Sequence, residues 1–348
     1  MQLKKVIIIV GLALLFVAAI IGFLFFGPAT KATEDGFFYV KSGATIADVK
    51  TELVAQQVLK GTGLFTTVSN IAGYENVKPG RYKIPSGTSI VNLVRLLKNG
   101  RQTPVNFVIT KLRTKENLAS RINKHFEVDS LAIINFVDSP DSLKPYGLDS
   151  STFMAMVMPY TYDVNWTASP RTIFDQFYKA YQTYWNADRK AKAGAKGLTP
   201  EQVVIFASIV EEETRDNKEK PDIASVYINR YRKNMLLQAD PTVKFALKDF
   251  GLRRILHIHL KAESPYNTYR NKGLPPGPIC TPSLESIDAV LNASETEYIY
   301  FVANSDFKGS HIFTTNYADH LKYAKLFQTE LTRRTKEKQA AADSAAKK

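Results

Sequence analysis

Three consecutive glutamates, Glu211 to Glu213, follow the apolar segment 203–210. A carboxyl group held against apolar surroundings keeps its proton near neutral pH, because burial disfavours the charged form. Such a proton can be given to a leaving group, so the triplet is a candidate site of general acid catalysis. The alternative interpretation is a solvated helix end that precedes the polar loop 215–220.

The residues before the triplet predict a helix with a well-marked start. Thr199 can cap it, and Gln202, three residues later, completes a capping box. At about 100° per residue the apolar positions form one stripe, with Glu211 and Glu213 on its two borders and Glu212 pointing to solvent. Periodicity alone does not choose between Glu211 and Glu213 as the buried acid.

The next predicted helix, 222–232, places Arg230 on an apolar stripe. A guanidinium group there either extends to solvent along its apolar stem or pairs with a buried carboxylate such as Glu211 or Glu213.

Further polar residues follow in a region typical of sugar recognition. Asp240 precedes a proline and is interpreted first as a helix N-cap, whereas Gln238 has no evident structural role. The segments 264–269 and 273–279 form a long loop rich in aromatic, amide and proline residues. Aromatic rings cover apolar sugar faces and amides bind hydroxyl and N-acetyl groups, so this loop is a candidate substrate-binding surface.

The amino terminus predicts a membrane anchor. Lys4 and Lys5 precede an uncharged apolar stretch, 6–26, that as a helix is about 31 Å long and matches the hydrocarbon core. The two lysines place residues 1–5 in the cytoplasm, so we expect a single-pass plasma-membrane protein whose remaining residues lie outside the cytoplasm. The alternative of a cleaved signal peptide has only a weak cleavage site to support it.

The net charge limits the kinds of partner that the chain can bind, and the cysteine content limits its disulfides and metal sites. The 348 residues carry a net charge of +13, which suggests polyanions; the predicted export excludes nucleic acid and favours anionic lipids or an acidic wall polymer. One cysteine, Cys280, excludes an internal disulfide. We expect no metal or cofactor, and we interpret His257 and His259 as an exposed basic pair.

The exported part predicts an α+β fold in two domains. A strand, a Ser-Gly turn and a capped helix recur at an offset of 44 residues within 36–104, in an arrangement that resembles the small sugar-binding LysM fold. The alternative is a spacer that binds nothing. A larger α+β domain, 105–330, follows, with a surface loop at 186–197, and a basic Ala-rich tail, 331–348, ends the chain as a frayed helix or a disordered extension.

Six motifs in one order carry a specific resemblance. They are the segments 207–214, 224–230, 237–243, 266–269, 273–277 and 309–313. Together they resemble the YceG-like (MltG) family of membrane-anchored endolytic murein transglycosylases. The chain departs from the family pattern at 111–113, where the family tends to have a Glu-Gly turn, and at 158–160, where it tends to have Phe-Pro-Asp.

The resemblance implies residue roles. The family's catalytic glutamate, first in the acidic run, aligns with Glu211. Residues expected to bind or orient the substrate are Asn229, Arg230, Gln238, Asp240, Tyr266, Asn267 and Tyr269, together with Glu213.

The resemblance also implies a reaction. Glu211 is expected to protonate the oxygen between N-acetylmuramic acid and N-acetylglucosamine and then to accept the proton of the muramic C6 hydroxyl, which closes a 1,6-anhydro ring. Expected partners are glycan strands of peptidoglycan, the membrane and peptidoglycan synthases (penicillin-binding proteins), and the expected role is to terminate or trim nascent strands. The alternatives are a muramidase that hydrolyses the same bond and a non-catalytic, membrane-tethered peptidoglycan-binding protein.

Overall fold

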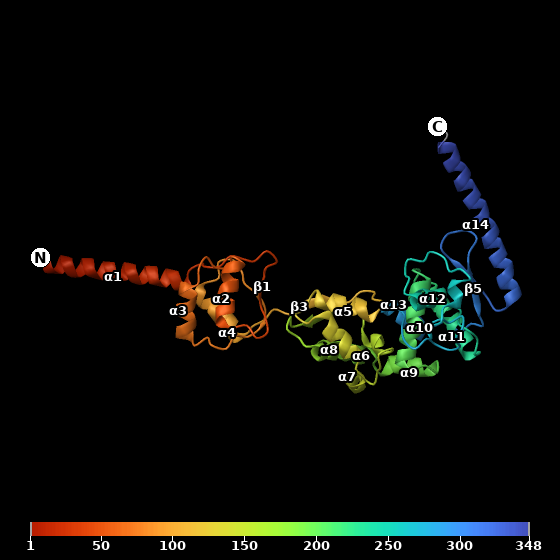
Figure 1. The fold of residues 1–348 in the computed structure, drawn as a ribbon, viewed down its shortest axis with the longest axis horizontal. Coiled ribbons are helices and arrows are strands. Elements are labelled where there is room, and N and C mark those ends of the chain that lie inside the picture. The colour runs from red at the N-terminus through yellow and green to blue at the C-terminus, as the bar shows by residue number, and fades with distance from the viewer. Residues whose placement is uncertain (1, 347–348) are drawn as a thin grey trace. The chain divides into compact units, whose positions relative to one another are not determined.

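The computed structural model describes residues 2–346, and Figure 1 colours its helices and strands in chain order from red to blue. The chain forms two compact units. The first unit comprises residues 1–107, 121–130 and 162–173, and the second comprises 108–120, 131–161 and 174–348. The chain contains both helices and short strands, as the α+β prediction requires. The domain boundaries predicted from the sequence stay predictions.

The first unit begins with a long apolar helix and continues with the predicted repeat. Helix α1 (Gln2–Phe26) contains a stretch, Leu3–Phe26, that is long and apolar enough to cross a membrane. The elements that follow are β1 (Phe37–Val40), α2 (Ile46–Ala55), α3 (Gly63–Ala72), β2 (Gly80–Lys83) and α4 (Ile90–Asn99).

The two copies of the repeat pack against each other. Strands β1 and β2 pair antiparallel, with Phe38 opposite its repeat equivalent Tyr82. Thr45 caps α2 and Ser89 caps α4 with side-chain hydrogen bonds, as predicted, because each hydroxyl accepts an otherwise unpaired amide at the helix start. The inward faces of both copies form one apolar core. That this unit is a LysM-like domain stays a prediction.

Helices dominate the rest of the chain. The short strands β3 (Val105–Val108) and β4 (Thr161–Val164) pair with each other. In chain order the helices before the acidic triplet are α5 (Lys115–Asn123), α6 (Ser130–Asp138), α7 (Pro140–Leu143), η1 (Lys144–Tyr146), η2 (Phe153–Met156), α8 (Pro170–Tyr184) and α9 (Ala187–Ala195). Helix α9 corrects the surface loop predicted at 186–197: Asn186 caps it through its side chain, a start signal that the lysine and glycine content of the segment obscured.

The central helix of the second unit is α10 (Pro200–Glu213), which ends in the acidic triplet. Its capping box from Thr199 to Gln202 is formed as predicted. All residues from Val203 to Val210 are buried, so the helix is covered on every side rather than along one stripe. It packs against α9, α11 (Lys220–Arg232), α12 (Asp240–Leu247) and α13 (Leu284–Leu291) (Figure 1).

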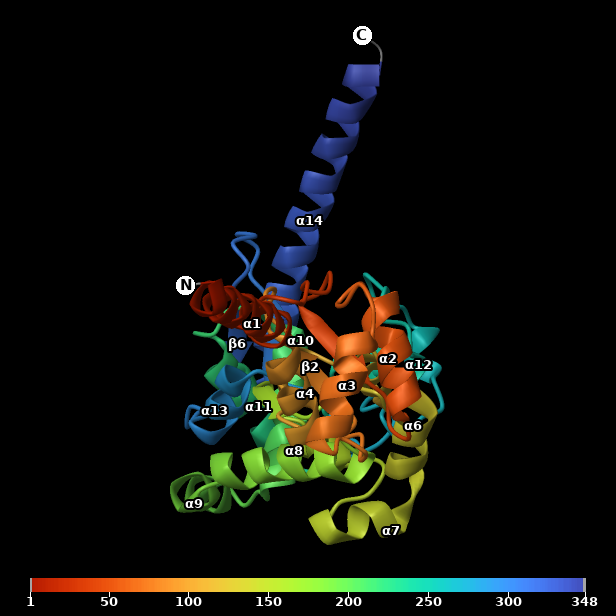
Figure 2. The same cartoon turned by 90° about the vertical axis from the view of Figure 1, so that its left-hand side faces the viewer.

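The chain ends with a hairpin and a long helix. Strands β5 (Tyr300–Ala303) and β6 (His311–Thr314) pair antiparallel, as predicted, and the short helix η3 (His259–Lys261) lies in the loop after α12. Helix α14 (Tyr317–Ala346) projects from this hairpin (Figure 2) and includes most of the predicted tail; residues 347–348 lie outside the described part of the chain.

Candidate active site

The carboxyl end of α10 borders a cleft of about 720 Å³ in the second unit. All three glutamates line it, together with basic residues from the segments 111–113 and 215–220 and with the start of α13. The cleft is also lined by Lys111, Arg113, Thr214, Arg215, Asn217, Lys220, Ser283 and Glu285. The cleft is therefore a polar site built around the triplet.

Glu211 connects α10 to the amino-terminal end of α13. Its Oε2 accepts hydrogen bonds from the hydroxyls of Ser283 and Ser286, each at 2.6 Å, and from the Lys220 amine at 3.3 Å. Burial raises the pKa of Glu211, but the two hydroxyls and the nearby lysines Lys220 and Lys111 outweigh burial, so the pKa lies below its usual value. Glu211 is thus held as a carboxylate.

Glu212 is not solvated, which corrects the prediction from helix periodicity. Its carboxylate pairs with Lys111 at 2.8 Å and with Arg113 at 3.0 Å, and its side chain is 16% exposed. Burial raises its pKa, but these two cations outweigh burial and lower it. The segment that departs from the family pattern, 111–113, therefore supplies the partners of Glu212.

Glu213 is the carboxyl group with the strongest desolvation of the three. Burial raises its pKa to about 7, and the hydrogen bond that Tyr227 donates to its Oε1 at 2.6 Å only partly opposes this effect. The negative charges of Asp240 and Glu212 raise the pKa further. With a pKa of about 7 the Glu213 carboxyl is protonated in a large fraction of molecules near neutral pH, which is the state that the sequence argument requires of the catalytic acid.

Asp240 and Tyr269 form a hydrogen-bonded pair in the neighbourhood of Glu213. The Tyr269 hydroxyl donates to Asp240 at 2.6 Å, and the pKa of Tyr269 is raised by burial and by the negative charges of Asp240 and Glu213. The helix start predicted at Asp240 is confirmed, but its role as N-cap is wrong: Ala239 occupies the cap position and no side chain caps the helix. Asp240 is free to bond Tyr269 because it is the first residue inside the helix.

Arg230 bonds Gln238 and does not bond Glu211. Its guanidinium group donates to the carbonyl oxygens of Leu236 (2.9 Å) and Ile299 (3.3 Å) and to Oε1 of Gln238. Gln238 has a left-handed backbone with φ of 53°, a conformation that side chains other than glycine rarely adopt. The fork of Arg230 holds this strained turn in place.

Three other predicted site residues have mainly structural contacts. Asn267 is fully buried and donates to the carbonyls of Leu260 and Ala262, so its amide orders the loop instead of facing the cleft. Asn229 donates to the backbone carbonyls of Thr296 and Tyr298. The ring of Tyr266 packs against Phe245 with centroids 4.5 Å apart.

Sequence reasoning missed the groups that differentiate the glutamates. Ser283, Ser286 and Lys220 fix the charge of Glu211, and Tyr227 bonds Glu213. The serines lie more than 70 residues beyond the triplet, and only the Ser283 cap of α13 left a local sequence signal. Tyr227 lies among the buried residues of α11, and helix periodicity predicts burial of its ring but gives no signal for the bond of its hydroxyl.

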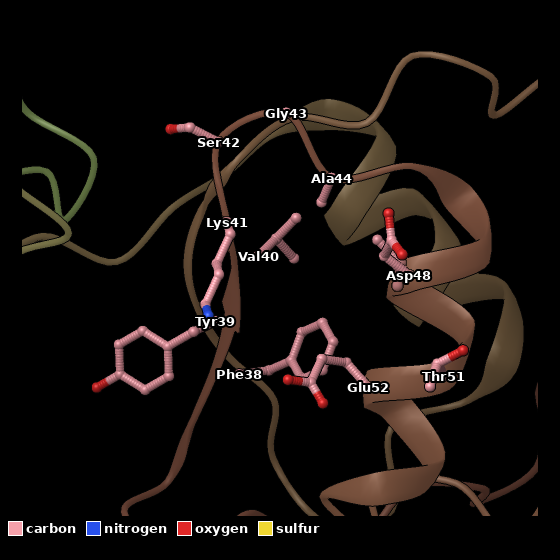
Figure 3. Close-up of a pocket in the computed structure, with 11 residues that line it drawn as sticks. Phe38, Tyr39, Val40, Lys41, Ser42, Gly43, Ala44, Asp48, Thr51 and Glu52 are labelled. Atoms are coloured by element: carbon pink, nitrogen blue, oxygen red, sulfur yellow. The ribbon is translucent and has the colours of Figure 1, made fainter.

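The first unit contains a separate hollow of about 490 Å³ between β1 and α2. Figure 3 shows the ring of Phe38 directed toward α2, whereas Tyr39 and Ser42 point away from it. Asp48 and Glu52 of α2 and Lys41 of the turn contribute charged groups to the lining. This hollow has the polar and aromatic groups that sugar binding uses, but it lacks a deep enclosed pocket.

The sequence and the fold of this chain are similar to those of known proteins. A model described as the YceG-like family matches residues 38–326. A Bacillus subtilis (strain 168) protein named endolytic murein transglycosylase is 28% identical over 305 residues, which cover 81% of this chain and 82% of the relative. A protein of the same name from Streptococcus pneumoniae serotype 2 is 24% identical and is covered over 56% of its length. The crystal structure of a YceG-like protein from Listeria monocytogenes aligns with 26% identity and a TM-score of 0.55, covering 83% of this chain and 99% of that one.

Proposed function

Because this chain belongs to the YceG-like family, we propose that it is an endolytic murein transglycosylase, a lyase that cuts the glycan strands of peptidoglycan. The names of its relatives support the reaction class. The observation that carries the proposal is Glu213, a cleft carboxyl whose pKa is raised to about 7 by burial. Breaking a glycosidic bond requires such a proton donor.

Glu213 protonates the glycosidic oxygen between N-acetylmuramic acid and N-acetylglucosamine in this proposal. The bond to the muramic anomeric carbon breaks, and positive charge develops on the sugar ring. The C6 hydroxyl of the same residue then attacks that carbon, and the Glu213 carboxylate accepts its proton. Atoms and charges balance without water, and one group acts first as acid and then as base.

The remaining groups have supporting roles. Tyr227 orients the Glu213 carboxyl through its 2.6 Å hydrogen bond, and Asp240 keeps the proton on Glu213 by like-charge repulsion. Tyr269 bonds Asp240 and Gln238 bonds Arg230, and we propose from the family resemblance that these two side chains bind sugar hydroxyl or N-acetyl groups. Glu211, already bonded by two serines and a lysine, fixes α13 against α10; its assignment as the acid by resemblance stays a prediction that the same variants test.

The reaction is tested by the chemistry of the products. Purified full-length protein in detergent is incubated with isolated peptidoglycan, and the released fragments are weighed by mass spectrometry. We expect ends that are one water lighter than hydrolysed ends and that resist borohydride reduction, because a 1,6-anhydro ring has no reducing aldehyde. Reducing ends would identify a muramidase instead.

A non-catalytic wall-binding protein is the second candidate, and the hollow of the first unit is the observation that favours it. A pure binder releases no fragments and is unaffected by Glu213→Gln, whereas the enzyme variant still binds glycan but releases almost nothing.

We further propose that the chain is anchored in the plasma membrane by α1, with its folded units outside the cytoplasm, and that it trims nascent strands beside peptidoglycan synthases. Support for the anchor is the apolar segment Leu3–Phe26 behind two lysines.

A further inference from the structure

The segment 247–261, from the last residue of α12 into the loop before Tyr266, has no buried residue. Its sequence nevertheless includes seven large apolar residues. Four of them are strongly exposed: Leu247 (40%), Phe250 (36%), Leu256 (51%) and Ile258 (64%). Single exposed apolar residues are ordinary on protein surfaces, but four within twelve positions of one segment are a concentration that favours an interaction surface.

The positive charges of this segment favour an anionic partner. Lys248, Arg253, Arg254 and Lys261 are all exposed, whereas Asp249 is the only acidic residue among the fifteen. Cations interleaved with large apolar side chains are what an anionic bilayer surface binds: the apolar groups enter the boundary between headgroups and acyl chains, and the cations contact lipid phosphates. A glycan strand would need donors and acceptors at the apolar positions, which Leu256 and Ile258 do not offer.

We propose that segment 247–261 is a docking surface for an anionic lipid bilayer, with Leu256 and Ile258 inserted at the interface and Arg253 and Arg254 on lipid phosphates. If α1 anchors the chain, it keeps the segment at high effective concentration near the bilayer, so that a weak interaction suffices.

The docking surface is connected to the candidate active site. The Arg113 guanidinium lies over the ring of Phe250, 5.0 Å from its centroid, and also pairs with Glu212 in the cleft. The same loop continues into Asn267 and Tyr269. Docking therefore holds the cleft near a membrane surface through the contact of Arg113 with Phe250.

A fluorescence experiment on the full-length chain tests the proposal. Ile258→Cys is labelled with an environment-sensitive dye and the chain is reconstituted into nanodiscs of phosphatidylglycerol or of phosphatidylcholine. The native Cys280 is 1% exposed and resists labelling, which the unsubstituted chain verifies. We expect blue-shifted emission that brominated acyl chains quench in phosphatidylglycerol, and much less quenching in phosphatidylcholine.

Two controls make the result specific. Leu131→Cys, at an exposed leucine (65%) of α6 in the same unit, reports any general proximity to the disc and should not be quenched. Arg253→Gln with Arg254→Gln should weaken docking about thirtyfold, since each cation near an anionic surface contributes about a factor of five. This double variant should still cleave soluble glycan fragments at the normal rate, which shows that it folds.

Equal quenching at positions 258 and 131 would overturn the proposal. A blue shift without quenching by brominated lipid would also overturn it, because the surface would then be covered by protein, from this chain or a second copy.

Discussion

At the scale of single residues, three adjacent glutamates differ because each meets a different set of partners. Hydroxyls and a buried lysine lower the pKa of Glu211, two partly exposed cations lower that of Glu212, and desolvation raises the pKa of Glu213 to about 7. Helix periodicity predicted that a buried acid lies in this triplet and left Glu211 and Glu213 open, whereas the family resemblance assigned the catalytic role to Glu211. Periodicity could not choose between them, because the deciding serines, lysine and tyrosine come from α11 and α13 and meet the triplet only in the folded chain.

Glu213→Gln is expected to lower activity on peptidoglycan about a thousandfold, within the range of a lost general acid. Its thermal unfolding midpoint at pH 6 should not fall and should lie above that of the wild type, because glutamine has the shape of the protonated carboxyl and needs no proton uptake on folding. The measurement is fragment release together with thermal unfolding of the same preparation.

Glu211→Gln is the matched variant and should behave in the opposite way. Removing the partner of the buried Lys220 amine costs about 3 kcal/mol of unfolding free energy, so the midpoint should fall by several degrees. Activity below that midpoint should fall less than tenfold. A dead but fully stable Glu211→Gln, with an active Glu213→Gln, would instead support the assignment made by resemblance.

The pH dependence follows from the raised pKa of Glu213. Activity should fall tenfold per pH unit above about pH 7, because the acid then loses its proton. The folded pKa lies above the unfolded value near 4.3, so the stability that this group contributes is complete below about pH 4 and is lost as pH rises through 7. The unfolding midpoint of the wild type relative to Glu213→Gln should decline between those values; a constant difference would contradict the raised pKa.

At the scale of elements, α10 is held in place by the helices that pack against its buried residues. Its start was predictable because capping boxes are local, and the hairpin β5–β6 was predictable from alternation. Its full enclosure was not, since periodicity cannot distinguish a helix covered on one face from one covered on all. Helix α9 was missed for the related reason that Lys, Ala and Gly residues carry no apolar pattern.

Ser208→Ala should destabilise the second unit through a lost link between α10 and the segment before α13. The hydroxyl donates to Ile205 and accepts the buried amide of Ile279 at 3.0 Å, and leaving that amide unpaired costs about 1 to 3 kcal/mol. Thr199→Ala, at the exposed cap of the same helix, should cost only about 1 kcal/mol. Denaturant titrations of both variants measure which of them loses more unfolding free energy. A Ser208→Ala protein as stable as the wild type would show that the link is dispensable.

At the scale of the whole molecule, the long apolar helix was predictable from composition, whereas the contacts that gather distant segments into each compact unit were not. Segments 121–130 and 162–173 belong to the first unit although they lie within the sequence range predicted for the second domain. Contacts such as those from Ser42 to Glu127, at 2.6 and 2.7 Å, join residues 85 positions apart, and no local pattern announces them.

Replacing residues 1–26 with a cleavable export signal should release the chain from the membrane fraction without abolishing cleavage of purified peptidoglycan. The reason is that α1 contributes no residue to the cleft. Cell fractionation and product mass analysis measure the two properties. A remainder that high salt removes from membranes fits the docking surface; a chain that stays membrane-bound after salt would contradict α1 as the anchor.

The pairing of β1 with β2 has a consequence for the symmetry of the first unit. Phe38 faces Tyr82, its own counterpart 44 residues later. At the same offset Phe37 corresponds to Arg81 and Tyr39 to Lys83, so the neighbouring pairs, Phe37 with Lys83 and Tyr39 with Arg81, are equivalent to each other. Such a register is a local two-fold axis, the symmetry that two identical chains adopt when they pair. The two strands of the repeat are thus related as in a symmetric dimer, although both belong to one chain and α3 lies in the connection between them.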